Sequence, residues 1–214
     1  SVLYSYKSIK EVTLETMISH SKSVRLGVQK SLMIVDMPYN TYRNPKEALR
    51  NAKIVKKKTK CDGVKLEGGK KIIPIVKTLI KNNIPVMGHV GILPQTDKKF
   101  SFKGKKIKES ERILNDTKLL EKAGAFSIVL ECIETKLSKK ITDYIKIPTI
   151  GIGSSSNCDG QVLVIDDLIG MSDSNFKFVK KYADVSKIID RAVKKYKLEV
   201  KRKQFPAAKH SFRN

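Results

Sequence analysis

The 214-residue chain has no tryptophan, only three cysteines and three histidines, and 21 acidic residues against 44 basic ones. The cysteines form no Cys-x-x-Cys pair, so neither a disulfide framework nor a zinc knuckle is indicated. No apolar run approaches the roughly 20 residues of a membrane span, and the first residues lack the apolar core of a signal peptide. These absences predict reduced thiols, no membrane partner and a cytoplasmic protein.

The shortage of acidic residues leaves a formal net charge of +23, which raises the hypothesis of nucleic-acid binding. Only seven of the basic residues are arginine, although the bidentate guanidinium is favoured in base and phosphate recognition. The lysines are spread over the polar segments, and no nucleic-acid-binding motif accompanies them. We interpret them as a solvated surface whose field also attracts anionic small substrates, and we expect no nucleic-acid partner.

Short apolar runs rich in β-branched residues alternate with amphipathic stretches along the chain. Buried parallel strands have this composition, and parallel strands require crossover helices between them. The pattern therefore predicts a parallel α/β architecture. Among the intervening stretches, helices are predicted over 45–58, 72–81 and 110–122. The predicted strands lie at 32–35, 63–66, 84–87, 126–130, 147–152 and 162–165.

Polar residues and a glycine follow the ends of several predicted strands, namely Asp36, Glu67, His89, Glu131 and Gly153. A closed barrel builds its site from the C-terminal ends of several strands in this way. The alternative, an open doubly wound sheet, lacks support because neither a G-x-G-x-x-G nor a phosphate-loop motif is present. We predict a (βα)₈ TIM barrel, with about six of its eight strand–helix units in this chain. Residues 1–214 are predicted to form one partial barrel domain that includes a C-terminal helix at about 185–203.

The carboxylates of Asp36 and Glu67 each precede a sharp turn, Met-Pro in one case and Gly-Gly in the other. Taken singly, each is equally well explained as a helix cap or a loop salt bridge. Together they could hold a hard cation such as Mg²⁺, which binds through one or two carboxylates and leaves positions for water or substrate oxygens. Three histidines at unrelated spacing disfavour a zinc site.

Lys65 and His89 each have a structural and a functional interpretation. Lys65 lies two positions before Glu67 and therefore on the same strand face. Its ammonium needs an anionic partner there, and an ion pair with Glu67 or Asp36 explains it as well as capture of a substrate carboxylate does. His89 is flanked by glycines that let another group approach the backbone closely. A lone histidine is more often structural, so the pattern alone does not decide its role.

Glu131 leaves an apolar run, where partial desolvation suits a general base near neutral pH. A salt bridge at the rim of the barrel is the alternative interpretation. Cys132 beside it is interpreted as a small buried side chain, because no Cys–His–Asn arrangement can be argued from the sequence.

Eight phrases, in order and over essentially the whole chain, resemble the ketopantoate hydroxymethyltransferase family. They are VTLETM at 12–17, DMPYNTY at 36–42, VKLEGG at 64–69, IPVMGHVGILPQT at 84–96, EKAGAFSIVLEC at 121–132, IPTIGIGSSSNCDGQVLVIDDLIGM at 147–171, FKFVKKYAD at 176–184 and FPAAKHSF at 205–212.

The resemblance implies a (βα)₈ barrel, a homo-oligomer that is a decamer in the family, and an Mg²⁺ requirement. It also implies transfer of a one-carbon unit from 5,10-methylenetetrahydrofolate to the keto acid 3-methyl-2-oxobutanoate, in pantothenate biosynthesis. Carried over by motif, Asp36 would bind the metal and contact the keto acid, and Glu67 would bind the metal. Lys65 and His89 would bind the keto acid, and Glu131 would be the catalytic base.

The chain departs from the family in two respects. A Gly-Asp-Ser motif that supplies a further metal ligand in the family is expected a few residues before Ser1, together with the first two barrel strands. The loop at 151–156 is less glycine-rich than its family counterpart. Two alternatives stay open: a related Mg²⁺ barrel that acts on phosphoenolpyruvate-like acids without folate, and a basic nucleic-acid-binding protein.

Overall fold

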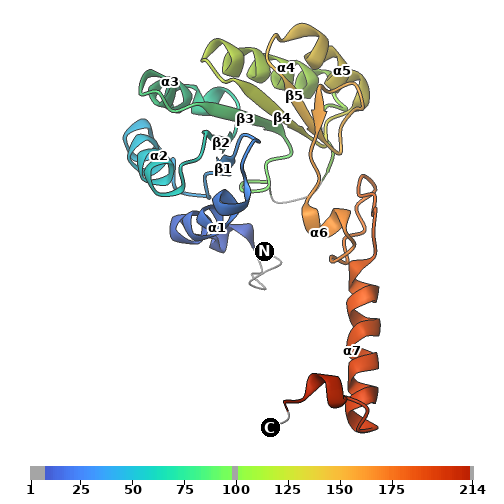
Figure 1. Ribbon diagram of the computed structural model, residues 1–214. Helices are drawn as coiled ribbons and strands as arrows, with labels where there is room; N and C mark the ends of the chain where they lie inside the picture. The colour runs from blue at the N-terminus through green and yellow to red at the C-terminus, as the bar shows by residue number, and fades with distance from the viewer. Residues whose placement is uncertain (1–7, 98–100, 213–214) are drawn as a thin grey trace. The chain divides into compact units, whose positions relative to one another are not determined.

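The protein is described by a computed structural model that covers residues 8–97 and 101–212. Its internal contacts divide the chain into two compact units, Ser1–Val162 and Leu163–Asn214. The first unit contains the sheet and the second contains helix α7, Val185–Lys201 (Figure 1). The helix predicted at about 185–203 is confirmed by α7, whereas a single domain over 1–214 stays a prediction.

The first unit is a six-stranded parallel sheet whose spatial order follows the chain, β1-β2-β3-β4-β5-β6. Sequential parallel order is that of a barrel wall, whereas an open doubly wound sheet reverses its order at a switch point. The strands therefore form part of a TIM barrel, as predicted. They are β1 Ile34–Asp36, β2 Gly63–Glu67, β3 Val86–Gly91, β4 Ser127–Glu131, β5 Thr149–Ile152 and β6 Gly160–Gln161.

Helices connect the first five strands and lie along one face of the sheet (Figure 1). In α2, Asn44 accepts the backbone N–H of Glu47 at 3.0 Å and Pro45 occupies the first turn, which together start the helix. The helices of this unit are α1 Leu14–Gly27, α2 Pro45–Thr59, α3 Ile73–Lys81, α4 Ile107–Lys122 and α5 Thr135–Tyr144. The three predicted helices are confirmed, although α4 begins three residues earlier than predicted.

The core lies between the sheet and these helices. In β2, Val64 and Leu66 are fully buried in it, while Lys65 and Glu67 alternate onto the opposite face. Each fully buried aliphatic side chain of this kind contributes about 1.5–3 kcal/mol. Alternation thus uses the apolar residues of the strand for stability and leaves the charged ones for the barrel interior.

The sixth strand is not where the apolar run predicted it. The run at 162–165 is not a strand: β6 covers only Gly160–Gln161, and helix α6, Ile165–Leu168, begins where the predicted strand ends. Val162 makes one further backbone bond, to Gly151 O at 3.0 Å, and its side chain is 46% exposed. The valines of this run therefore do not enter the core, and no helix separates β5 from β6 in the described residues.

In the second unit, Asp184 begins α7 by accepting the backbone N–H of Lys187 at 3.2 Å. Its carboxylate also lies 2.7 Å from the Lys187 ammonium. These contacts hold the pKa of Asp184 below its ordinary value. Over both units, no helix in the described part of the chain has the length and apolar character needed to cross a membrane.

Candidate functional site

Strand register brings the predicted site residues to one end of the barrel wall. Asp36 at the end of β1 lies opposite Lys65 in β2, and Glu67 at the end of β2 lies opposite His89 in β3. Glu131 at the end of β4 lies opposite Gly91. Because parallel strands all end at the same edge, residues 22 to 40 positions apart in the sequence become neighbours.

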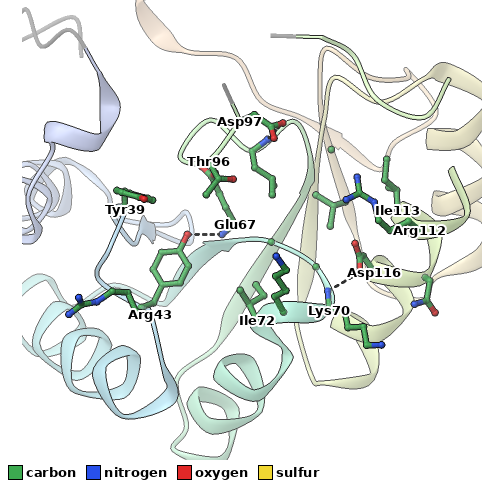
Figure 2. A pocket seen from close by; sticks show the side chains of 18 of the residues that line it. Tyr39, Arg43, Glu67, Lys70, Ile72, Thr96, Asp97, Arg112, Ile113 and Asp116 are labelled. Carbon is green, nitrogen blue, oxygen red and sulfur yellow. Dashed lines mark hydrogen bonds between the residues drawn. The ribbon is translucent and has the colours of Figure 1, made fainter. Parts of the chain in front are cut away.

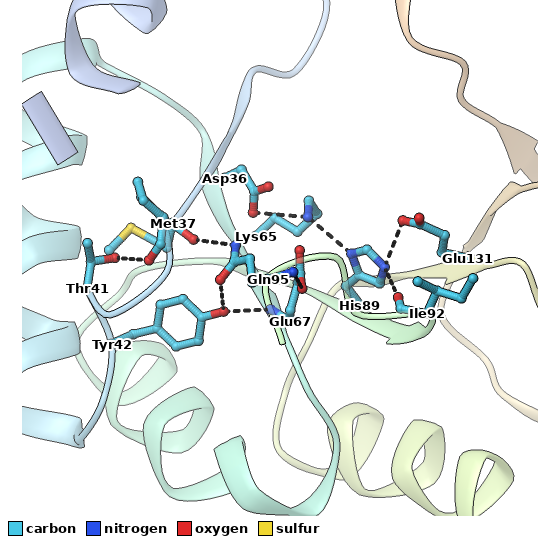
Figure 3. Close-up of polar contacts among 11 residues, drawn as sticks. Asp36, Met37, Thr41, Tyr42, Lys65, Glu67, His89, Ile92, Gln95 and Glu131 are labelled. Atoms are coloured by element: carbon cyan, nitrogen blue, oxygen red, sulfur yellow. Dashed lines mark hydrogen bonds and ion pairs between the residues drawn. The ribbon is translucent and has the colours of Figure 1, made fainter. Parts of the chain in front are cut away.

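Four of these side chains form a continuous line across β1 to β4, here called the charged line: Asp36, Lys65, His89 and Glu131 (Figure 3). Lys65 Nζ lies 3.0 Å from Asp36 Oδ1 and 3.1 Å from His89 Nδ1. His89 Nε2 lies 3.2 Å from Glu131 Oε2. Of the partners predicted for Lys65, Asp36 is therefore the one in contact.

The line fixes the tautomer of His89. An ammonium group can only donate, so Nδ1 must accept from Lys65 and the ring proton must be on Nε2. Nε2–H can then donate to Ile92 O at 3.0 Å or to the Glu131 carboxylate. His89 is 2% exposed, so this neutral ring links the half-buried ammonium to the carboxylate without adding a second buried charge.

Asp36 retains binding capacity. Its side chain is 38% exposed, but its Oδ1 is buried. The contact with Lys65 satisfies the distance of an ion pair without the angles of a hydrogen bond, so Oδ1 has no hydrogen-bond partner in the described residues. An acceptor in this state is open to a further donor or to a cation.

Glu67 lies beside the line and is 7% exposed. Its Oε2 accepts the backbone N–H of Gln95 at 3.0 Å. Burial raises the pKa of the Glu67 carboxyl above its ordinary value of 4.5, and the Lys65 ammonium and the Gln95 N–H offset only part of this rise. The carboxylate is thus in an environment that favours an added positive charge.

Gln95 and Tyr42 were missed by the sequence reasoning. Gln95 Nε2 donates to Met37 O at 2.9 Å, and its Oε1 accepts the Tyr42 hydroxyl at 2.7 Å (Figure 3). The same hydroxyl accepts the Glu67 N–H at 3.4 Å. Since Gln95 is 4% exposed, these bonds join the ends of β1 and β2 to the loop after β3. The sequence signal that could have identified Gln95 is a polar residue within the mostly apolar phrase at 84–96.

Gly91 and Cys132 lie next to Glu131, at the end of the charged line. Gly91 has φ +101°, and a Cβ there would lie 2.1 Å from Glu131 O, so only glycine allows β3 to approach β4 at this point. Burial, and then the Glu131 charge, raise the pKa of the Cys132 thiol to about 11. It therefore stays protonated near neutrality, consistent with a small buried side chain rather than a nucleophile.

A cavity of about 950 Å³ opens next to Glu67 (Figure 2). Its walls come from the loops after β1, β2 and β3 and from α4. Of the five predicted site residues, only Glu67 lines it. The cavity therefore lies next to the charged line and is not lined by it. The acid–base groups belong to the charged line.

The acidic residues of the site could hold Mg²⁺ through two protein carboxylates. In the described part of the chain no three His, Cys, Asp or Glu side chains are grouped for a metal. Mg²⁺, however, is commonly held by one or two carboxylates, with waters and substrate oxygens completing its shell. The Asp36 carboxylate, whose Oδ1 is ion-paired with Lys65 without a hydrogen bond, and the desolvated Glu67 carboxylate match that donor chemistry.

Acid and base groups that meet at the C-terminal ends of four sequential parallel strands define a TIM-barrel enzyme site. The chain belongs to the ketopantoate hydroxymethyltransferase family, whose sequence profile matches residues 1–208. The resemblance found in the sequence is thereby confirmed.

Individual proteins agree with this assignment. The chain is 63% identical to the 3-methyl-2-oxobutanoate hydroxymethyltransferase of Pelagibacter ubique, over 99% of this chain and 82% of the relative. It is 46% identical to the protein of the same name from Carboxydothermus hydrogenoformans, over 99% of this chain and 78% of the relative. The fold resembles that of 2,3-dimethylmalate lyase, a PEP mutase/isocitrate lyase superfamily member, with a TM-score of 0.53, 15% identity and coverage of 72% and 57%.

Proposed function

We propose that the protein transfers a one-carbon unit from 5,10-methylenetetrahydrofolate to 3-methyl-2-oxobutanoate, giving ketopantoate on the route to pantothenate. The observation that carries the proposal is the charged line at the strand ends of a chain 63% identical to an enzyme of that name. The cytoplasmic location and homo-oligomeric assembly expected from the sequence remain predictions.

The charged line suits a small α-keto acid. Lys65 provides an ammonium that is 19% exposed and can pair with the substrate carboxylate. Asp36 beside it would contact the same substrate. With Nε2 protonated, His89 offers a hydrogen-bond donor toward the substrate or Glu131. When bound by Asp36 and Glu67, Mg²⁺ would act as a Lewis acid on the keto oxygen.

Glu131 would remove the C3 proton. Its side chain is 15% exposed and its Oε2 faces His89 Nε2, which orients the carboxylate. The electrons of the C3–H bond become the C2–C3 double bond of the enolate, and the proton passes to Glu131. One water breaks the two C–N bonds of the folate methylene bridge, which leaves tetrahydrofolate and a one-carbon unit at the oxidation level of formaldehyde. C3 then forms the new C–C bond with that carbon, and the carbonyl oxygen of the unit takes up the proton to become the hydroxyl group.

Deuterium exchange at C3 of 3-methyl-2-oxobutanoate, followed by proton NMR with and without Mg²⁺, tests this proposal in the complete gene product. Exchange isolates the proton-transfer step and needs no folate. Glu131→Gln should slow it by about 10²–10⁴-fold, the usual contribution of a general base. Glu111→Gln, the same substitution at an exposed position of α4, is the control. Normal exchange in Glu131→Gln would refute the assignment of the base, and transfer without folate would favour the phosphoenolpyruvate-type alternative.

A further inference from the structure

The turn after β4 determines where the Glu131 carboxylate lies. Glu131 is the last residue of β4, and Cys132 after it has φ +50°, in the left-handed region that residues other than glycine seldom adopt. A backbone held in this region costs free energy, so the surrounding contacts must maintain it. The contacts that maintain the turn therefore also orient Glu131.

Backbone bonds from both neighbouring strands hold part of this turn. On the β3 side, the Glu131 carbonyl accepts the Ile92 N–H at 2.9 Å. On the β5 side, the Cys132 N–H donates to Ile152 O at 2.8 Å. Because β5 ends at Ile152, its backbone gives Ile133, the next residue of the turn, no partner in the described part of the chain.

The side chain of Ser154, two residues beyond β5, continues this pairing in place of the backbone. Its Oγ accepts the Ile133 N–H at 3.1 Å and donates its proton to Leu130 O at 2.7 Å. Both directions are fixed, because an amide N–H can only donate and a carbonyl can only accept. In a hydrogen-bonded four-residue turn, the first carbonyl and the fourth N–H bond each other directly. Here the Ser154 hydroxyl lies between these two groups, and Glu131 and Cys132 are the central residues.

The other serines of the loop bond elsewhere. Ser155 is 2% exposed, and its Oγ accepts the backbone N–H of Asn157 at 3.1 Å and the side-chain amide of the same residue at 2.9 Å. Ser156 is exposed. Among the three serines, and within the described residues, Ser154 alone bonds the turn after β4. The link between β5 and Glu131 therefore depends on this one position and not on the serine content of the loop.

We propose that Ser154 is a positioning residue for Glu131: by bridging the two ends of the turn, its hydroxyl fixes the direction in which the carboxylate leaves β4. The inference rests on the proposed function, in which Glu131 removes the C3 proton. To do so, the carboxylate must keep its place beside His89 Nε2, 3.2 Å away, and reach the substrate at the same time. A displacement of about 1 Å can slow such a reaction about 100-fold, so the loss of one hydroxyl at the turn should be measurable as a rate.

The test applies the C3 deuterium-exchange assay to the complete gene product. Ser154→Ala should lower the maximal exchange rate by about ten- to hundredfold, because the base is misplaced. The half-saturating keto acid concentration should change by less than about twofold, because the groups that bind the keto acid are not altered. Ser154→Thr, which keeps the hydroxyl, should retain most of the rate. Ser155→Ala and Ser156→Ala, the same kind of change in the same loop, are the matched controls and should retain it as well.

Two further measurements distinguish positioning from a purely structural bond. In a Glu131→Gln background, Ser154→Ala should change the residual C3 exchange by less than about twofold, since the base that it positions is already absent. Amide hydrogen exchange in the segment 130–134, followed by mass spectrometry, reports the bond to Ile133 and needs no activity. It should be faster in Ser154→Ala than in the unaltered protein.

The outcomes separate this inference from the proposed function. A lower maximal rate in Ser154→Ala, absent from the control variants and from the Glu131→Gln background, supports the positioning role. An unchanged rate in Ser154→Ala, an equal loss in Ser155→Ala or Ser154→Thr, or the same fold-loss in the Glu131→Gln background overturns that role and leaves the proposed function standing. An unaltered protein that does not exchange the C3 proton with Mg²⁺ present refutes the proposed function and the positioning role with it. Faster amide exchange in Ser154→Ala would then identify the bond as structural.

Discussion

At the scale of single residues, burial of Glu67 makes the free energy of unfolding depend on the protonation of a site residue. Its pKa is raised in the folded protein, so the folded state holds this proton more tightly than the unfolded state. Its contribution to stability is fully present below the ordinary pKa of 4.5 and is lost as the pH rises through the higher folded value. Above the ordinary pKa, desolvation of this carboxyl is therefore a cost to the fold.

Glu67→Gln should accordingly raise the free energy of unfolding at pH 7 in metal-free buffer, because the amide oxygen can still accept the Gln95 N–H. The gain should shrink as the pH falls toward 4.5. Urea unfolding in the presence of a chelator, at several pH values, measures this difference. A variant that is less stable than the unaltered protein at pH 7 would show that the charge itself contributes to the fold. The same variant should lose Mg²⁺-dependent exchange.

At the scale of elements, the hydrogen bonds of Gln95 and Tyr42, here called the Gln95 tie, connect the ends of β1 and β2 to the loop after β3. Burial raises the pKa of the Tyr42 hydroxyl, which therefore remains a donor to Gln95 Oε1 throughout the working pH range. Neither residue belongs to the charged line. Their effect on catalysis should therefore come through the positions of Asp36, next to Met37, and of Glu67.

Tyr42→Phe should lower the free energy of unfolding by about 1–2 kcal/mol, because it leaves the buried Gln95 Oε1 without its partner. It should also reduce the maximal rate of C3 exchange more than it changes the keto acid concentration for half saturation. Tyr144→Phe, at an exposed residue of α5, is the control for loss of a phenolic hydroxyl. A Tyr42→Phe protein with lower stability but an unchanged exchange rate would limit the tie to a structural role.

The elements also show what the sequence could predict. Strands β1 to β5 were predictable because buried parallel strands concentrate β-branched residues. Polar residues after the predicted strands gave four of the five proposed site residues, and Lys65 was found as a charged residue inside an apolar strand. β6 was misplaced because Gly160–Gln161 has no apolar character while the neighbouring Val162 and Val164 do. The Gln95 tie could not be predicted, since its partners lie 28 and more positions away and the bond geometry depends on how the loops fold.

At the scale of the whole molecule, the dominant property is the net charge of +23. Like charges spread over the surface repel one another and oppose the compact state, and salt screens them over a Debye length of about 10 Å at 0.1 M. The melting temperature should therefore rise by a few degrees between about 20 and 200 mM NaCl, on the scale expected for roughly 1 kcal/mol. Calorimetric scans in NaCl measure it. A melting temperature that falls with salt would mean that local ion pairs outweigh the general repulsion.

The charged line also constrains how this protein can change over evolutionary time. Lys65 balances Asp36 on one side and donates to His89 on the other, so a neutral residue at position 65 is tolerable only alongside changes at both neighbours. Libraries that randomise these positions one at a time will return mostly inactive clones. Functional alternatives are to be found by varying positions 36, 65, 89 and 131 together, because each of these side chains depends on its neighbours in the charged line.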